Sequence, residues 1–161
     1  LYPATEPRYA AIDLEGKSEN LPALTASQPV EYFDVSPDGA RIAYVVRRPG
    51  DGSVLLLVSD RAFKEPKTIA DLGSMPKLGT MEGRNHSAVF PKWSPDGRMI
   101  AYYGNNDKIE LHVVAADGAW NHTVETGELR HANMLVPPAW SPDSTKLGMT
   151  LVGASNGEVN V

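Results

Sequence analysis

Apolar and polar residues alternate with a period of two over several short stretches of this 161-residue chain, which is the pattern of half-buried β-strands. Residues 54–58 and 109–114 are the most apolar of these stretches, and more polar segments at 67–70 and 121–124 are expected to form half-exposed outer strands. No apolar pattern of period 3.6 persists for the ten or so residues that a helix prediction needs. The sequence therefore predicts a nearly all-β fold.

A twelve-residue motif occurs three times without gaps: Phe-Asp-Val-Ser-Pro-Asp-Gly-Ala-Arg-Ile-Ala-Tyr at 33–44, with counterparts at 91–102 and 138–149. The spacing of the last two copies is close to the roughly 40–45 residues of a four-stranded propeller blade. Proline fixes φ and glycine accepts a left-handed conformation, so Ser-Pro-Asp-Gly predicts a tight turn between two strands. In the third copy Ser144 replaces the glycine. We expect a different turn there, because a left-handed non-glycine residue costs about 1–2 kcal/mol.

The strand pattern predicts an all-β, single β-propeller segment over residues 1–161. It contains a blade part at 8–25, complete blades at 32–71 and 90–125, and a blade part at 138–161. Trp93 and Trp140 are predicted to be buried at equivalent places, with Ile42, Ile100 and Leu147 in the cores between blades. About three blade-equivalents of four antiparallel strands fall below the four to eight blades of known propellers. We expect the chain to belong to a six- to eight-bladed ring, completed by further propeller segments or by a second copy.

The repeated motif resembles the repeat of TolB-like propellers, whose consensus runs apolar-x-Trp-Ser-Pro-Asp-Gly-x-x-Ile-Ala-Tyr. The resemblance covers residues 8–161, with departures at Val35, Ser144 and Gly148. It implies one of several activities, because one fold hosts many functions. Similar blades occur in periplasmic accessory proteins that bind partners, in the gating propellers of prolyl-oligopeptidase-like serine hydrolases, and in some polysaccharide lyases and tricorn-like proteases.

Composition removes several classes of function. The chain has no cysteine and carries a formal net charge of −5 with scattered basic residues, so neither thiolate chemistry nor a nucleic-acid partner is expected. No apolar run approaches the roughly 20 residues that span a bilayer, and no membrane insertion is expected. The four histidines are not spaced as metal ligands, so we predict no metal site and no cofactor. His112 and His122 alternate along strands and are interpreted as packed or solvated.

The candidate binding residues lie in two loops that connect successive blades. The long loop between 71 and 90 contains Arg84, Asn85 and His86, and the next such loop contains Arg130, His131 and Asn133. These loops are expected to share one face of the propeller, and long loops on a rigid scaffold tend to carry function. Their donors suit carboxylate, sugar or peptide groups.

The leading interpretation is a non-catalytic scaffold that binds a protein or peptide through this loop face, in the periplasm or outside the cell, although the sequence also allows a cytoplasmic location. One alternative is the gating propeller of a prolyl-oligopeptidase-like serine hydrolase, and another is a propeller-face enzyme such as a polysaccharide lyase. The segment 153–157, Gly-Ala-Ser-Asn-Gly, fits a nucleophile-elbow pattern. It is interpreted as a turn, because the elbow requires a following helix and downstream Asp and His residues.

Overall fold

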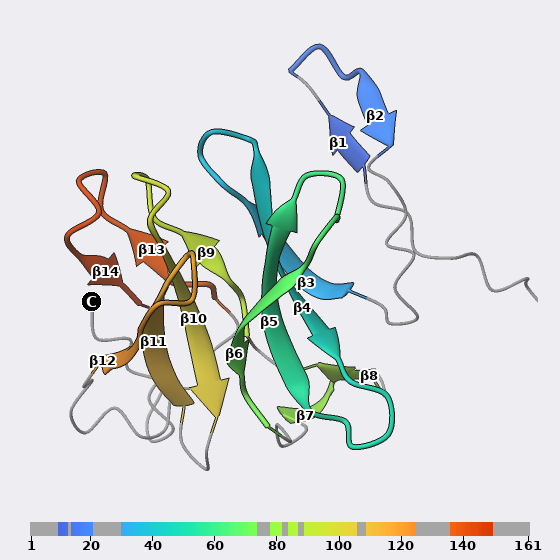
Figure 1. Ribbon diagram of the computed structural model, residues 1–161, viewed down its shortest axis with the longest axis vertical. Helices are drawn as coiled ribbons and strands as arrows, with labels where there is room; N and C mark the ends of the chain where they lie inside the picture. Colours follow the sequence, from blue (N-terminus) through green and yellow to red (C-terminus); the bar gives the residue numbers. More distant parts are fainter. Residues whose placement is uncertain are drawn as a thin grey trace, which may run out of the picture.

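The computed structural model describes residues 10–12, 14–20, 30–73, 78–81, 84–86, 89–105, 109–124 and 136–149. In this part of the chain all regular structure is β, and no helix occurs, as predicted (Figure 1). The strands form two four-stranded antiparallel sheets and three two-stranded hairpins.

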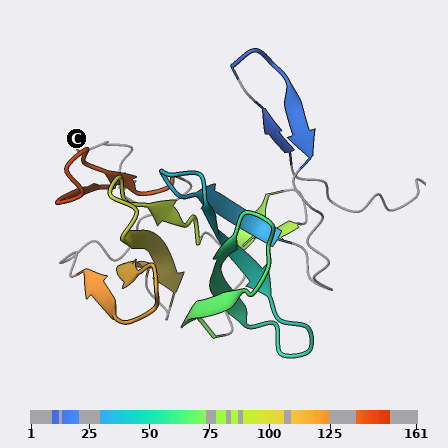
Figure 2. The ribbon, with the colours of Figure 1, turned by 45° about the horizontal axis from the view of Figure 1, so that its top comes forward.

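The first sheet contains β3 (Val30–Val35), β4 (Arg41–Arg47), β5 (Val54–Asp60) and β6 (Lys67–Asp71), paired in chain order. The second contains β9 (Lys92–Trp93), β10 (Met99–Asn105), β11 (Ile109–Ala115) and β12 (Asn121–Val124), again in chain order. The two sheets lie side by side in both views (Figures 1 and 2). Four-stranded antiparallel meanders packed on one another are the arrangement of consecutive propeller blades.

The remaining strands form three hairpins: β13 (Ala139–Trp140) with β14 (Leu147–Gly148), β1 (Ala10–Ile12) with β2 (Ser18–Asn20), and β7 (Leu78–Met81) with β8 (Arg84–His86). The β13–β14 hairpin starts the blade after the second sheet. β1 pairs with Ser18–Asn20 across a turn in which Gly16 has φ of 83°. The β7–β8 hairpin was not predicted, since 71–90 was interpreted as loop.

One turn is repeated in all three copies of the motif. In the first copy the Gly39 N–H donates to the Ser36 carbonyl (2.8 Å), and the Ser36 hydroxyl donates to Asp38 (2.5 Å) while accepting from the Arg41 N–H (2.8 Å). The same contacts recur at Ser94 and at Ser141. The serine hydrogen bond is the main cause that lowers the pKa of Asp38, and its counterparts act likewise on the other two aspartates. The motif's serine therefore closes the hairpin as much as its proline and glycine do.

The expectation of a different turn at Ser144 is wrong. Ser144 has φ of 60°, close to the 70° of Gly39 and Gly97, and its N–H makes the same bond to Ser141. The Ser144 hydroxyl accepts a hydrogen bond from the Asp96 N–H of the neighbouring blade (3.1 Å). This bond and the serine–aspartate network hold the residue in a conformation that its Cβ disfavours.

The core between the first and second sheets is apolar. It is formed by side chains of one face of each sheet: Ala43, Val45, Val54, Leu56, Val58, Ile69 and Ala70 from the first, and Val89, Trp93, Ile100, Tyr102, Val114 and Ala116 from the second. Trp93 is 6% exposed and Ile100 is fully buried, as predicted. A second core between the second sheet and the β13–β14 hairpin contains Tyr103 and Leu111 with Trp140 and Leu147, and Trp140 is half-buried where burial was predicted.

Ile42 is buried on the opposite face of the first sheet, with Tyr44 and Val46. This is the face that turns away from the second sheet. Ile100 and Leu147, which are equivalent to Ile42 in the repeat, each pack toward the preceding blade.

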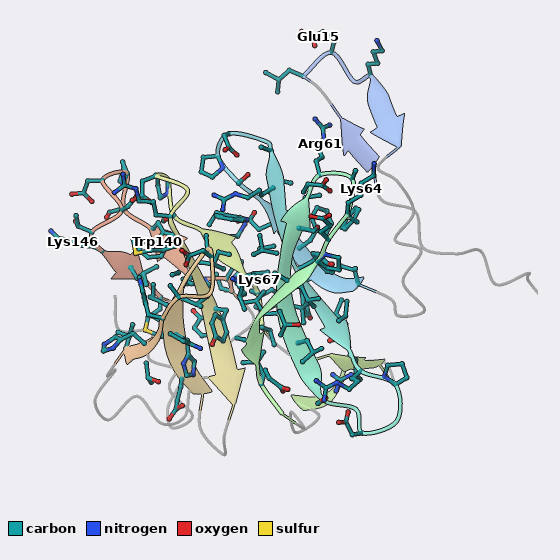
Figure 3. All side chains as sticks on the ribbon, in the orientation of Figure 1. Glu15, Arg61, Lys64, Lys67, Trp140 and Lys146 are labelled. Atoms are coloured by element: carbon teal, nitrogen blue, oxygen red, sulfur yellow. The ribbon has the colours of Figure 1, made fainter. Side chains whose placement is uncertain are left out.

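The tryptophans of the motif fasten each blade to the preceding one. The Trp93 indole N–H donates to the Asp34 carbonyl (3.2 Å), and the Trp140 indole N–H donates to the Lys92 carbonyl (3.0 Å), which occupies the equivalent place (Figure 3). Two further contacts join the first and second sheets: the Asp34 carboxylate accepts from the Trp93 backbone N–H (2.9 Å) and forms an ion pair with Lys92 (3.1 Å). The repeat thus sets both the strands and their junctions.

Candidate functional site

The two ends of the sheets carry different sets of loops. The turn end carries the turns between first and second strands (36–39, 94–97 and 141–144) and between third and fourth strands (61–66 and 116–119). The connection end carries the loop 48–53 and the β7–β8 hairpin (Figure 1). Consecutive antiparallel strands place these two sets of loops at opposite ends by necessity.

The predicted binding residues belong to the connection end, as far as the structure describes them. Arg84, Asn85 and His86 form β8, which pairs with β7, but their side chains lie outside the description. Arg130, His131 and Asn133 also lie outside the described residues. Whether the two sets meet in one site therefore stays a prediction.

The described part of the connection end is held by ion pairs. Arg47 pairs with Glu31 (3.0 Å) and donates to the Gly52 carbonyl (2.9 Å). Arg48 bridges Asp51 and Asp71 at 3.2 Å each. Hydrogen bonds from Ser53, its backbone N–H first, lower the pKa of Asp51. These contacts tie the loop 48–53 to the edge strand β6, at the end of the sheets that also carries β8.

An open groove of about 570 Å³ lies at the turn end, where the first and second sheets meet. Its lining comes from the start of β4, from the β9–β10 turn and from the β11–β12 turn, and the side chains used below are Arg41, Asp96, Arg98, Asp117 and Trp120. The sequence analysis did not predict this site, because the turns were interpreted only as structural. An aromatic residue placed directly after the Asp-Gly-Ala turn was the available signal.

Arg41 forms the inner wall of the groove and is already committed to the fold. Its guanidinium lies over the Trp93 ring, 4.7 Å from the ring centroid, and donates to the Gly97 carbonyl (2.8 Å). A cation over an indole face is attracted by the ring's quadrupole. Arg41 therefore adds positive charge to the groove without being free to rearrange.

Trp120, Arg98, Asp96 and Asp117 are the exposed large or charged side chains of the groove. Trp120 is 47% exposed. Its counterpart in the first sheet's turn, Phe63, instead packs against Tyr44 with ring centroids 5.4 Å apart. Arg98 is exposed, and within the described residues its guanidinium makes no hydrogen bond. A large exposed aromatic residue beside a guanidinium that makes no hydrogen bond within the described residues is a common composition of binding sites.

The acidic side chains of the groove are engaged by their own turns. Asp96 accepts from the Ser94 hydroxyl (2.6 Å) and from the Arg98 N–H (3.1 Å), and the Ser94 bond is the largest cause that lowers its pKa. Asp117 accepts from the Ala119 N–H (2.9 Å). Lys67 reaches from the first sheet to the Asp117 carbonyl (2.6 Å; Figure 3). Both carboxylates thus stabilise turns. The Arg98 guanidinium keeps N–H groups that can donate hydrogen bonds to a ligand.

A polar cluster lies on the second sheet around His112. The imidazole stacks on Tyr102 (5.1 Å, 11°), with Nδ1 3.2 Å from the Thr123 hydroxyl and Nε2 3.5 Å from Glu110. Burial is the main cause that lowers the pKa of His112, and Glu110 opposes it. Gly104 makes room for the ring, because a Cβ there would come within 2.6 Å of Nε2. His112 is thus packed and His122 exposed, as the sequence indicated.

The described residues contain no group of three or more His, Asp or Glu side chains that could hold a metal ion. Within the same part of the chain, no helix has the length and apolar character to cross a membrane.

The sequence matches no family model. It is 31% identical over 144 residues to an uncharacterized peptidase of Bacillus subtilis, YuxL, covering 84% of this chain. This chain spans only 19% of that relative's length.

Solved structures match the fold. An oligogalacturonate lyase in complex with manganese superimposes with a TM-score of 0.61 at 16% identity, covering 92% of this chain and 39% of the lyase. TolB from Acinetobacter baumannii gives 0.54 at 19% identity, covering 92% and 38%. The fold is that of a β-propeller. The tricorn protease gives 0.51 at 20% identity, over 83% of this chain and 12% of the protease. At these identities the likeness concerns the propeller fold alone, and it supports the TolB-like blades expected from the motif.

Proposed function

We propose that this chain is the polypeptide-binding propeller portion of a longer, peptidase-like protein, and that it carries no catalytic residues of its own. The observation that supports this most is the 31% identity to a peptidase over 84% of this chain, combined with a coverage of only 19% of that peptidase. We place the hydrolytic residues in the part of such a protein that lies beyond the propeller segment. The binding-scaffold and gating-propeller interpretations then describe the same role.

The His112 cluster does not argue for catalysis. A hydroxyl, an imidazole and a carboxylate follow one another at Thr123, His112 and Glu110. However, Thr123 and His112 are direct cross-strand partners on one face of the sheet, and Glu110 is two residues from His112. Contact between such side chains is the ordinary outcome of antiparallel pairing. We interpret the cluster as packing that supports the second sheet.

The ring around these blades would be completed by further blades of the same protein. The chain covers 38–39% of two propeller-containing structures while 92% of the chain itself is matched. A second copy of the chain is the alternative occupant. Sedimentation of the isolated chain separates the two, since association into a defined dimer is expected only if a second copy closes the ring. Fractionation of cells that carry the intact gene tests the proposed periplasmic or extracellular location.

Binding is measured by fluorescence anisotropy of a fluorescein-labelled unstructured polypeptide, reduced and carboxymethylated α-lactalbumin, titrated with the 161-residue chain. We expect saturable binding without cleavage, whereas the intact protein binds and cleaves. A variant with Arg84, His86, Arg130 and His131 all changed to Ala should bind more weakly at an unchanged melting temperature, because loop residues on a rigid frame carry recognition more than stability.

Absence of binding by the wild-type chain, or cleavage by the isolated chain, would contradict the proposed function. Full binding by the quadruple variant would contradict only the assignment to the connection end. A peptide with every residue of the D configuration serves as a control for nonspecific adsorption.

A further inference from the structure

The turn-end groove lies at the opposite end of the sheets from the residues predicted to bind, and no part of the proposed function uses it. Its exposed side chains include the Trp120 indole and the Arg98 guanidinium, which makes no hydrogen bond within the described residues, beside the carboxylates of Asp96 and Asp117. We propose that this groove is a second binding site, for a polypeptide segment that presents a carboxylate next to an apolar side chain.

Trp120 is held rigidly although it is exposed. Its carbonyl accepts from the Ala115 N–H (3.0 Å), and the turn before it is closed by Gly118, whose N–H donates to the Ala115 carbonyl (2.8 Å) and whose φ is 72°. A Cβ on Gly118 would lie 3.4 Å from Ile69, so the turn is seated against the first sheet. An aromatic ring on such a frame loses little conformational entropy when it binds a partner.

The exposure of Trp120 is not explained by the repeat. The equivalent turn of the first sheet also begins with an aspartate that accepts a backbone N–H, at Asp60 as at Asp117. Its aromatic residue, Phe63, covers Tyr44 and is partly buried. Within the described residues Trp120 makes no ring contact of that kind. Its indole is therefore available to an apolar side chain of a partner.

The hydrogen-bond donors of the groove indicate which polar group lies next to the apolar side chain of the ligand. Asp96 and Asp117 accept hydrogen bonds from their turns, whereas the Arg98 guanidinium retains its donors. Arg41 and Lys67 add positive charge at fixed places on either side. A guanidinium recognises a carboxylate through two parallel hydrogen bonds, which a neutral amide cannot match. The group complementary to the Arg98 guanidinium is therefore a carboxylate.

The carboxylate could come from a Glu or Asp side chain or from the C-terminus of a polypeptide, and the two sources are distinguished by three probes. The first is fluorescein-Gly-Phe-Glu-Phe-Glu-Gly-amide. The second replaces both glutamates by glutamine, and the third is a glutamine peptide that ends in a free phenylalanine carboxylate. Anisotropy is recorded while each probe is titrated with the wild-type chain at low and at high salt.

We expect the glutamate or the free-carboxylate probe to bind at least about tenfold more tightly than the glutamine probe, and to weaken in high salt. Arg98→Gln should lose about tenfold in affinity for the favoured probe, and Trp120→Ala should lose affinity for all apolar probes. Lys64→Ala is the control, because it removes an exposed cation from the β5–β6 turn of the first sheet, which contributes no lining residue to the groove (Figure 3). It should bind within about twofold of wild type.

Both substitutions concern exposed side chains, so the melting temperature should stay within about 2 °C and folding does not confuse the result. Equal affinity of wild type for the glutamate, glutamine and free-carboxylate probes would overturn the proposal. Unchanged affinity in Arg98→Gln and Trp120→Ala would also overturn it. Neither outcome affects the proposed function, which rests on the labelled α-lactalbumin assay and on residues of the connection end.

Discussion

Removal of the Asp34 carboxylate is expected to weaken the junction between the first and second blades. Its two oxygens accept from the Trp93 backbone N–H (2.9 Å) and from the Lys92 ammonium (3.1 Å). In Asp34→Ala the backbone N–H of Trp93 loses its acceptor, and Trp93 is buried, with only 6% of its surface exposed. A buried donor left without a partner costs about 1–3 kcal/mol. The ion pair adds little, about 0–1 kcal/mol, because the Lys92 side chain is 40% exposed.

We therefore expect Asp34→Ala to lower the free energy of unfolding by about 2 kcal/mol, since the 22% exposure of Asp34 lets water compensate part of the loss. For a chain of this size the melting temperature should fall by about 4–8 °C. Asp34→Asn keeps an oxygen acceptor for the Trp93 N–H and should lose less than about 1 kcal/mol. Lys92→Ala removes only the ion pair and should also stay within about 1 kcal/mol of wild type.

The measurement is urea unfolding followed by tryptophan fluorescence, with calorimetry for the melting temperature. A loss in Asp34→Ala no larger than in Lys92→Ala would refute the reasoning, because it would show that the Trp93 N–H does not depend on the carboxylate. A loss in Asp34→Asn as large as in Asp34→Ala would show that charge, and not the acceptor oxygen, holds the junction.

Three further substitutions test separate features. Ser144→Gly should be more stable than Ser144→Ala by about 1–2 kcal/mol in urea unfolding, because both lose the bond from Asp96 but only alanine keeps the left-handed Cβ strain; equal stabilities would contradict this. Burial raises the pKa of Tyr103 to about 12, and its hydroxyl has no hydrogen-bond partner among the described residues. Tyr103→Phe should therefore leave the melting temperature unchanged or raise it, and a lower one would indicate a partner beyond them. Because burial lowers the pKa of His112 in the folded state, the unfolded chain binds that proton more readily, and stability should decrease as pH falls through about 6.5 toward the folded pKa. His112→Gln should reduce this loss of stability between pH 7 and 5. An identical pH profile would exclude His112 as its source. Glu110, which raises the pKa of His112, makes the loss smaller in the wild type.

Local chemistry was sufficient to predict the strands of the two complete blades and the turns within them. The alternation of apolar residues and the repeated Ser-Pro-Asp-Gly specified strand, turn and strand, and the repeat placed Trp93 and Ile100 between blades. The prediction was wrong at Ser144, where steric cost alone was considered. The compensating bond comes from Asp96 in the neighbouring blade, and a contact between blades is not visible in the turn's own sequence.

The candidate sites show the same division. Arg and His residues in the connecting loops could be named from the sequence, because loop length and residue type are local properties. The groove with Arg98 and Trp120 could not, because it forms where two turns of one blade meet Arg41 of another. The sequence also does not show that Trp120 is exposed while Phe63 is covered, since Tyr44 and Tyr102 hold equivalent positions in the repeat, yet Tyr44 packs on Phe63 and Tyr102 stacks on His112.

The sequence by itself determined the all-β repeat, because the period of hydrophobic positions and the turn residues act within a few residues of one another. Only the tertiary structure decided how the blades are joined and which side chains remain available at their ends. Burial, hydrogen-bond satisfaction and exposure depend on residues about 50 positions apart in the chain, such as Asp34 with Trp93 or Lys67 with Asp117. Those pairs come together only when two blades pack face to face.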